Sequence, residues 1–411
     1  MDSYLVGGAV RDKLLQLPVK DKDWVVVGAR IEDLVAKGYR QVGKGFPVFL
    51  HPETNQEYAL ARTEKKIGPG YTGFVFDTSE KITLEQDLFR RDLTINAMAE
   101  SRTGEVIDPY GGQEDLKNKI LRHVSSAFSE DPLRVLRVAR FAARLNHLGF
   151  KVAQETMELM VSMVASGELD TLVAERVWHE TEAALTSPSP QEFIRILRQC
   201  EALKIVLPEL DALFGVRQPE KRHPENDIGI YMLMCLEQVA KKSNDSAVRY
   251  ATMVHDVGKA FTDQSKSSSD SEHETLGLSL QRKIAKRLRV PNEHANLAAL
   301  VCEHRSKLLR IESLGPSEIL NMLESLDALR RPERLEKFLL ACEADAKYQS
   351  NIEKGEYPQR DYLTAILKEF SKLNFESLLA SDTQNSPAKL VRNARLTIIS
   401  NKIAQLAATN A

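Results

Sequence analysis

The sequence predicts an α+β N-terminal domain followed by a long all-α region, and two observations carry that prediction. From Tyr4 to about Phe128, short runs rich in β-branched and aromatic residues alternate with glycine-containing turns. From about Asp131 onward, the chain reads as one helix after another, separated by proline-containing or polar breaks. The chain contains no internal repeat.

In the N-terminal part, the strands are expected where β-branched or aromatic residues cluster, and the helices where leucine and valine recur at helical spacing. The expected strands are Trp24–Val27, Tyr39–Val42, Pro47–His51, Glu57–Ala61 and Glu105–Ile107, and the expected helices are Val10–Leu17 and Ile31–Lys37. Breaks in the helical part are expected at residues 187–190, at residues 221–224 and in a polar loop at residues 263–272.

Composition limits the class of protein. A chain of 411 residues with 43% hydrophobic and 28% charged residues can form several globular domains. No stretch approaches the roughly 20 apolar residues of a membrane span, and no signal-peptide pattern begins the chain, so a cytoplasmic protein without a membrane partner is expected. The four cysteines are scattered and are expected to be buried, reduced thiols. The net charge of −2 means that any nucleic-acid contact must come from local basic residues.

The stretch from Gly7 to Trp24 contains residue types suited to phosphate chemistry. A glycine pair allows backbone N–H groups to approach an anion, and Arg11 offers several donors to phosphate oxygens. Asp21 and Asp23 alternate along the edge of an expected strand, so their side chains would point the same way and could hold a divalent metal together. Taken separately, the glycines could form an ordinary turn and the acids could be solvated.

The order of these residues resembles a known motif. Gly-Gly-x-x-Arg-Asp, followed nine residues after Asp12 by Asp-x-Asp and Trp-Val-Val-Val, is similar to the first motif of the class II tRNA nucleotidyltransferase and bacterial poly(A) polymerase superfamily. The resemblance implies a polymerase-β-like nucleotidyltransferase head over residues 1–128. It also implies that Asp21 and Asp23 are catalytic and hold two Mg²⁺ ions, while Gly8 and Arg11 bind the nucleotide.

Three further segments of the head support this resemblance. The octet Arg90–Ala97 resembles the second motif, which would place Arg91 and Asn96 at the triphosphate and ribose and give Asp92 a positioning role. The segment from Arg62 to Tyr71 looks like the flexible loop that helps the family's site pass from one nucleotide to the next, which favours complete CCA addition over CC addition. Asp108–Leu116 resembles the third, architectural motif and is expected to be a turn that opens a helix.

A fourth motif begins the helical part. In Glu130–Arg134, Asp131 is expected to cap a helix that carries a stripe of arginines at helical spacing, namely Arg134, Arg137, Arg140 and Arg144. The stripe could be a solvated charged face, but its sequence resembles the family motif in which an acid and an arginine select the base. Cytosine and adenine both offer an amino donor beside a ring-nitrogen acceptor. Asp131 accepting and Arg134 donating would therefore suit these two bases. Arg137 and Arg140 match family positions that contact the nucleotide.

The rest of the chain is expected to be helical throughout. A neck at residues 129–215 would bind tRNA, an HD-like body would cover residues 216–330, and a tail would cover residues 331–411. In the body, His255 and Asp256 resemble the signature of HD-type metal phosphohydrolases, and His273 fits a later ligand. Tyr231 and Ser306 stand where related two-activity enzymes have a histidine and an aspartate. A degenerate, structural site is therefore expected more than an active one.

The resemblance identifies the chain as a member of the class II tRNA nucleotidyltransferases of the bacterial, HD-containing branch. The implied reaction extends tRNA with CCA from CTP and ATP, and no obligate protein partner is indicated. Five basic residues within 281–289 would contact the tRNA acceptor and T arms or simply be solvated. A poly(A) polymerase is an alternative, although residues 43–46 lack a second basic residue and no long basic tail follows. An HD-type metal phosphohydrolase with a vestigial head is another.

Overall fold

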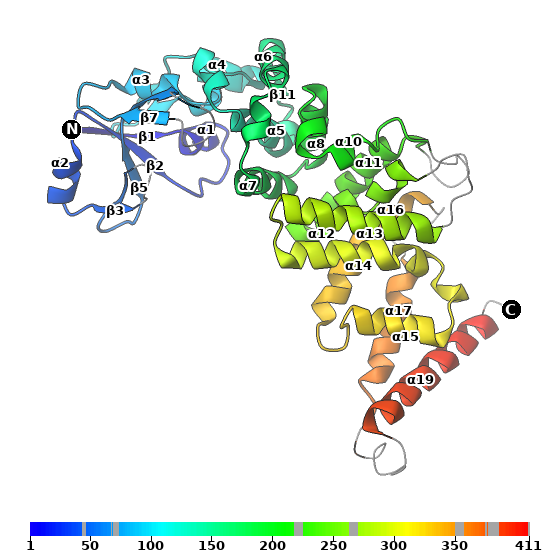
Figure 1. Ribbon diagram of the computed structural model, residues 1–411. Coiled ribbons are helices and arrows are strands. Elements are labelled where there is room, and N and C mark those ends of the chain that lie inside the picture. The colour runs from blue at the N-terminus through cyan, green and yellow to red at the C-terminus, as the bar shows by residue number, and fades with distance from the viewer. Residues whose placement is uncertain are drawn as a thin grey trace. The chain divides into compact units, whose positions relative to one another are not determined.

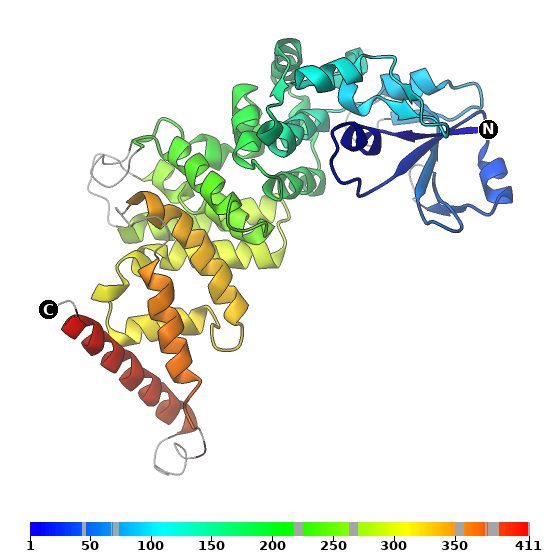
Figure 2. The ribbon, with the colours of Figure 1, turned by 180° about the vertical axis from the view of Figure 1, so that it is seen from behind.

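The structure is a computed structural model that describes residues 1–42, 47–66, 68, 74–217, 225–262, 270–349, 357–374, 376 and 386–409. The chain forms two compact units, Met1–Pro208 and Glu209–Ala411. The first unit combines a mixed sheet with helices, and the described part of the second is helical apart from an isolated bridge (Figures 1 and 2). The predicted fold class is therefore confirmed.

The first unit contains all the strands of the described chain, together with helices. The strands are β1 Asp2–Val6, β2 Asp23–Val27, β3 Arg40–Val42, β4 Val48–Leu50, β5 Glu57–Leu60, β6 Thr63–Lys66, β7 Phe74–Asp77, β8 Ala99–Glu100, β9 Val106–Ile107, β10 Ile120–Leu121 and β11 Lys151–Val152. The α-helices are α1 Gly8–Leu14, α2 Ile31–Ala36, α3 Leu84–Phe89, α4 Gly112–Asn118, α5 Leu133–Leu145, α6 Gln154–Ala165, α7 Ala174–Leu185, α8 Gln191–Gln199 and α9 Leu203–Val206. The 3-10 helices are η1 Thr94–Asn96, η2 Ser126–Glu130, η3 Asn146–Leu148 and η4 Glu168–Thr171.

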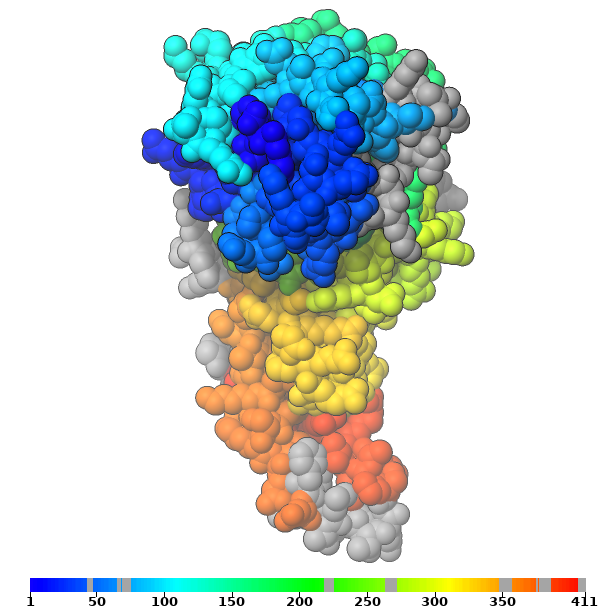
Figure 3. Space-filling view, turned by 90° about the vertical axis from the view of Figure 1, so that its left-hand side faces the viewer, coloured from blue at the N-terminus to red at the C-terminus, as the bar shows by residue number. Residues whose placement is uncertain are grey.

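The main sheet of the first unit is built around β2. Its strand order is β3-β4-β5-β2-β1-β8-β9, with β2 antiparallel to β1 and parallel to β5. Val25 belongs to a buried cluster on one side of the sheet and Val26 to a cluster on the other, so both faces of β2 are covered. This two-sided burial explains why β2 is an uninterrupted apolar run after Asp23 rather than an alternating one. In the space-filling view, blue to cyan residues of the N-terminal part lie at the surface of the first unit (Figure 3).

The seven elements expected in the N-terminal part are all present, with ends that differ by at most three residues. The sequence reading missed β1, β8 and helix α3, which are short or carry a mixed pattern. One expectation was wrong, because Thr63–Lys66 is not loop but the strand β6, which pairs antiparallel with β7. The remainder of that expected loop falls mostly outside the described residues. So do residues 43–46, the break at 221–224 and residues 263–269 of the expected polar loop.

Helix α5 follows the sheet and is packed on several sides. Pro132 precedes its first residue, and the backbone N–H of Leu133 donates to Asp131 Oδ1 at 3.1 Å, as the capping role predicts. Helices α7 and α8 both pack against it. Because other helices pack against α5, one of its arginines, Arg134, is buried, and packing fixes its position.

The second unit is a set of longer helices around α12. Its elements are α10 Pro208–Asp211, which spans the start of the unit, α11 Ile228–Ala240, α12 Ser246–Val254, η5 Val257–Phe261, α13 Asp270–Arg287, α14 Asn292–Leu309, η6 Ile311–Ser313, α15 Pro316–Ser325, α16 Pro332–Gln349, α17 Pro358–Phe370 and α19 Pro387–Thr409. Helices α11, α14 and α16 all pack against α12 (Figure 2). The four cysteines are free and buried, as expected. Among the described residues, no helix has both the length and the apolar character needed to cross a membrane.

Replacing Gly112 with alanine is expected to destabilise the first unit. The new Cβ would overlap the backbone oxygen of Thr94 and lie 2.8 Å from Met98 Cγ, where a buried backbone cannot give way easily. We expect a loss of about 1–3 kcal/mol in the free energy of unfolding, measured by chemical denaturation. The neighbouring, exposed Gln113→Ala serves as the control and should change stability little; equal losses in both variants would contradict this packing argument.

Candidate active site

Asp21 and Asp23 lie at the exposed beginning of β2. The pKa of Asp23 is raised, first by burial of its carboxyl group and further by the negative charge of Asp21, while Arg91 acts in the opposite direction. The two acids and Arg91 are therefore close enough to interact. Glu57 of β5 pairs in register with Asp23, so its side chain shares that face of the sheet.

These acids suit a divalent cation. Two carboxylates that repel each other gain most from a positive ion placed between them, and hard cations prefer oxygen ligands. Both residues remain exposed, so a bound ion would keep coordination positions for substrate oxygens. The donor set at the start of β2 thus fits the metal use that a nucleotidyltransferase requires.

The Gly-Gly turn brings Arg91 toward the acids. Gly7 has a φ of 68°, and a Cβ at this position would lie 2.9 Å from Arg91 Nη1. Glycine is therefore required here both by the backbone conformation and by the close approach of the guanidinium. Arg91 also donates to the buried carboxylate of Asp87 at 3.1 Å. Its Nε has no partner among the described residues.

Arg11 is buried and joins the glycine turn to the second motif. Its Nη1 donates to Asn96 Oδ1 at 2.6 Å, and its Nε donates to Asp12 Oδ1 at 2.9 Å. The guanidinium also lies 5.2 Å from the centre of the Phe141 ring on α5. Arg11 therefore links three segments that are distant in the sequence.

Asp92 is the centre of this network. Its Oδ1 accepts from the side chain of Asn96 at 2.9 Å, and its Oδ2 accepts from Arg137 Nε at 2.8 Å. Burial by itself would raise the pKa of Asp92, but the charge of Arg137 and the hydrogen bonds from Asn96 and Arg137 hold it well below its usual range. The carboxylate is thus ionised at neutral pH and aligns the second motif with α5.

The arginine stripe of α5 does not form an open basic surface. Each arginine has partners within the first unit, and three of the four have an acid. Arg137 contacts Asp92, Arg140 Nε lies 2.5 Å from Glu180 Oε2, Arg144 Nη2 lies 2.7 Å from Asp12 Oδ2, and Arg134 donates to the backbone oxygens of Ala127 and Arg90. The solvated-face alternative is therefore wrong for Arg134, which is only 7% exposed.

Asp131 and Arg134, the expected base-selecting pair, form hydrogen bonds with other groups of the protein. Asp131 Oδ2 accepts from Arg176 Nη2 of α7 at 2.9 Å. Arg134 donates through Nη1 and Nη2 at 2.6 Å each to the two backbone oxygens. The pair lies at the start of α5, and it would need to exchange these contacts to read a base.

The functional residues that the sequence analysis missed are charged side chains that form ion pairs with the expected site residues. Arg176 and Glu180 stand four residues apart on α7, so they lie on the same face of that helix. This spacing is the signal that could have identified them. Asp87 gives no such signal, because only the fold shows that it lies buried beneath Arg90 and Arg91.

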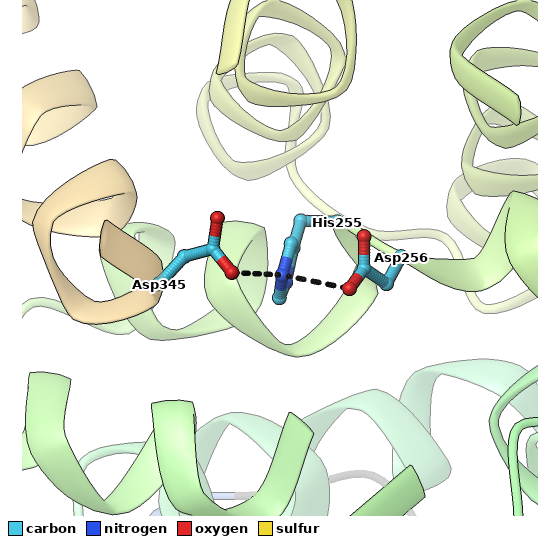
Figure 4. A group of neighbouring side chains, drawn as sticks. All are labelled: His255, Asp256 and Asp345. Atoms are coloured by element: carbon cyan, nitrogen blue, oxygen red, sulfur yellow. Dashed lines mark ion pairs between the residues drawn. The ribbon is translucent and has the colours of Figure 1, made fainter. Parts of the chain in front are cut away.

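In the second unit, the predicted HD pair lies in a buried polar cluster. His255, Asp256 and Asp345 bring ligand-type atoms within 4.8 Å of one another, and the imidazole lies between the two carboxylates (Figure 4). The second carboxylate of this cluster comes from Asp345 on α16, which the sequence analysis did not single out. The sequence reading missed Asp345, since it lies 89 positions after Asp256 (345 − 256).

His273 and Ser306 lie in the wall of a pocket beside this cluster. His273 Nδ1 is 2.7 Å from the hydroxyl oxygen of Thr262, and His273 does not belong to the group of three. His304, two residues before Ser306, forms a 2.7 Å hydrogen bond with Ser325. The structure therefore groups His255 and Asp256 with Asp345, which the sequence analysis did not predict.

The mixed sheet, the paired acids at the start of β2 and the arginines around them define the nucleotidyltransferase class. Comparison with known families agrees with this assignment. Residues 3–122 match the "Poly A polymerase head domain", and residues 149–214 match the "Probable RNA and SrmB- binding site of polymerase A".

Comparison with individual proteins defines the family more narrowly. A "Multifunctional CCA protein" of Vibrio vulnificus is 54% identical over 92% of this chain and 93% of its own length. A protein of the same description from Thioalkalivibrio sulfidiphilus is 54% identical over 89% of both chains. The chain therefore belongs to the multifunctional CCA protein family.

Solved structures support the fold. A CCA-adding enzyme in complex with ATP superimposes with a TM-score of 0.64 at 20% identity, covering 99% of this chain and 89% of that chain. A complex of a CCA-adding enzyme with CTP gives a TM-score of 0.62 at 22% identity, covering 98% of this chain and 87% of that chain. At these identities, the likeness concerns the fold alone.

Asp92→Asn is expected to weaken both the fold and the nucleotide site. The amide cannot keep the charge-assisted contact with Arg137, so we expect a loss of about 1–3 kcal/mol in the free energy of unfolding. The affinities for CTP and ATP should fall together, because the misaligned second motif serves both. Chemical denaturation and calorimetric titration measure these effects. Asp170→Asn, at an exposed position, is the control; an Asp92→Asn protein with unchanged stability would disprove the role of this carboxylate.

The stability of the second unit is expected to fall at alkaline pH. Burial alone would lower the pKa of His255, but Asp256 and Asp345 outweigh it and raise the pKa to about 9. Because the folded pKa lies above the unfolded value near 6.5, the stabilisation is complete below about pH 6.5 and disappears as the pH rises through about 9.

The test compares the unfolding free energy of the protein with that of His255→Gln across this range. Glutamine does not titrate in this range. The difference in unfolding free energy between the unsubstituted protein and the variant should therefore shrink by about 1–3 kcal/mol from the acidic to the alkaline end of the pH range. A difference that stays constant with pH would contradict the raised pKa.

Proposed function

We propose that this protein adds and repairs the 3′-terminal CCA sequence of tRNA without a nucleic-acid template, using CTP and ATP. The proposal is supported by its family membership and by one structural observation above all. Asp23 at the start of β2 pairs in register with Val6, directly before Gly7, where a Cβ would lie 2.9 Å from Arg91 Nη1. In each step, the 3′-hydroxyl oxygen of tRNA forms a bond to the α-phosphorus of the nucleotide. The bond from that phosphorus to the pyrophosphate oxygen breaks, and pyrophosphate leaves.

Mg²⁺ is the proposed metal, and Asp21 and Asp23 are the residues that would hold it. When bound, it would lower the pKa of the attacking hydroxyl and stabilise the charge of the leaving group. Two acids with oxygen ligands at an exposed strand edge suit this ion. Glu57 is in position to act as a further acid on the same face.

The nucleotide would be held by residues from the glycine turn, the second motif and α5. Gly8 and Arg91 are proposed to hold the triphosphate, and Arg11 to support them through Asn96. Arg137 and Arg140 are proposed to contact the nucleotide from α5. Their partners Asp92 and Glu180 fix the guanidinium groups in place before the substrate arrives, which reduces the entropy cost of binding.

Asp131 and Arg134 are proposed to select the base. The carboxylate would accept a hydrogen bond from the amino group of cytosine or adenine, and the guanidinium would donate to the ring nitrogen. Uracil and guanine present the opposite pattern there. Since Asp131 pairs with Arg176 in the free protein, nucleotide binding would exchange one charged partner for the base.

The proposed partner is tRNA, bound through its acceptor and T arms. We propose a head at residues 1–128, a tRNA-binding neck at 129–215, an HD-like body at 216–330 and a tail at 331–411. In the second unit, Arg282, Lys283 and Lys286 are exposed on α13 and offer local positive charge to phosphates. We also propose a cytoplasmic location, because all four cysteines are free thiols.

The decisive experiment supplies tRNA lacking its 3′ end with CTP, ATP and Mg²⁺ and resolves the products at single-nucleotide length. The unsubstituted protein should add C, C and A and then stop. Asp21→Ala should reduce addition on the order of 1,000-fold or more, because the metal ligand is lost. Asp131→Ala should retain addition but incorporate UTP or GTP more readily, because one half of the base contact is missing.

Asp361→Ala, at an exposed position on α17, is the matched control and should leave the product pattern unchanged. A run of A residues beyond the first would instead identify a poly(A) polymerase. Full activity of Asp21→Ala would overturn the assignment of the metal site.

A further inference from the structure

We infer that Arg305 occupies the cation position of the HD-like centre, so that this centre holds helices of the second unit together without a metal and does not cleave phosphate esters. The inference concerns a different unit from the proposed transferase site. It rests on the contacts around the two buried carboxylates of Asp256 and Asp345.

Arg305 of α14 bridges these two carboxylates directly. Its Nη1 lies 2.5 Å from Asp345 Oδ2, and its Nη2 lies 2.7 Å from Asp256 Oδ1. The arginine is only 8% exposed, so solvent does not compete for its donors. A metal ion that used these two oxygens would have to take the place of the guanidinium.

The remaining carboxylate oxygens are also engaged. The hydroxyl of Tyr231 donates to Asp345 Oδ1 at 2.8 Å, and Lys259 Nζ donates to Asp256 Oδ2 at 2.8 Å. All four oxygens therefore already accept from protein donors. A metal would gain its ligands only by breaking these hydrogen bonds.

The negative charges of the two carboxylates are compensated without an ion, and the imidazole of His255, which lies between them, adds further positive charge when it is protonated. The two negative charges face the positive charges of Arg305 and Lys259. Adding a divalent cation to this buried site would leave an excess of positive charge in a low-dielectric environment. Expelling Arg305 instead would leave a guanidinium buried without partners, which is strongly unfavourable.

Two further features oppose metal-dependent hydrolysis. Such chemistry needs an ion with an open position for water or substrate, held by several imidazole or carboxylate ligands. Tyr231 stands where the resemblance expects a histidine, and its hydroxyl serves Asp345 as a hydrogen-bond donor. Ser306 stands where an aspartate is expected, and it lies in the pocket wall.

The same contacts give the centre a structural role. They join α11 through Tyr231, the end of α12 through Asp256, α14 through Arg305 and α16 through Asp345. Four helices thus meet at one ion-pair network. Figure 4 shows the carboxylates of Asp345 and Asp256 on opposite sides of the His255 imidazole, in keeping with a centre that joins separate helices.

The first test uses the full-length protein carrying Asp21→Ala and Asp23→Ala, so that the transferase site contributes no metal binding. We expect Mn²⁺ and EDTA each to change the melting temperature by less than about 1 °C, since a ligand stabilises only a state that it binds. We also expect no hydrolysis of bis(p-nitrophenyl) phosphate with Mn²⁺ or Ni²⁺. A Mn²⁺-dependent shift or hydrolysis that disappears with His255→Ala would overturn the inference.

The second test adds Arg305→Ala to the same background. Removing the guanidinium frees both carboxylates, so this variant should bind Mn²⁺, with a melting temperature that rises with the metal concentration. Arg305→Lys keeps a cation and is expected to show no such rise. Circular dichroism checks that both variants are folded. A folded Arg305→Ala protein that gains no Mn²⁺ binding would show that the arginine does not hold the cation position.

Discussion

The first unit depends on the pairing of the α5 arginines with acids from other segments. Asp92, Glu180 and Asp12 neutralise Arg137, Arg140 and Arg144, and this pairing ties α5 to the head and to α7. Buried charges are tolerated only when they are paired and hydrogen-bonded. These ion pairs stabilise the arginines inside the protein. They also fix the orientation of the guanidinium groups, as a nucleotide site requires.

Asp21 and Asp23 differ from these acids in their exposure and in their neighbouring charges. Both residues keep exposed surface. For Asp23, the positive charge of Arg91 does not fully offset the partial burial of the carboxyl group and the repulsion by Asp21, so its pKa remains raised. The first unit thus contains acids that organise the fold through ion pairs, and two further acids that are proposed to hold metal. In the second unit, Asp256 and Asp345 belong to the organising kind, because Arg305 and Lys259 already satisfy them.

Much of the fold could be predicted from the sequence, because its elements carry strong local signals. The valine run of β2 and the cap of α5 at Asp131 are examples. The strand β6 was misjudged as loop, because four polar and charged residues form a strand only when β7 lies beside them. For the candidate site, the structure brings the expected residues Arg11, Asn96, Asp92 and Arg137 into contact. The sequence analysis did not single out Arg176, Glu180, Arg305 or Asp345.

The sequence by itself determined the α+β head, the helical remainder and the candidate motifs, because each depends on residues close together in the chain. The tertiary structure decided which charges meet. Asp92 finds Arg137 across 45 positions, and Arg305 finds Asp256 and Asp345 across 49 and 40. Coulombic interactions depend on distance in space and on burial, and neither quantity can be read from the order of residues. Only the folded chain therefore decides whether a carboxylate is free to bind a metal ion or is already paired with a basic side chain.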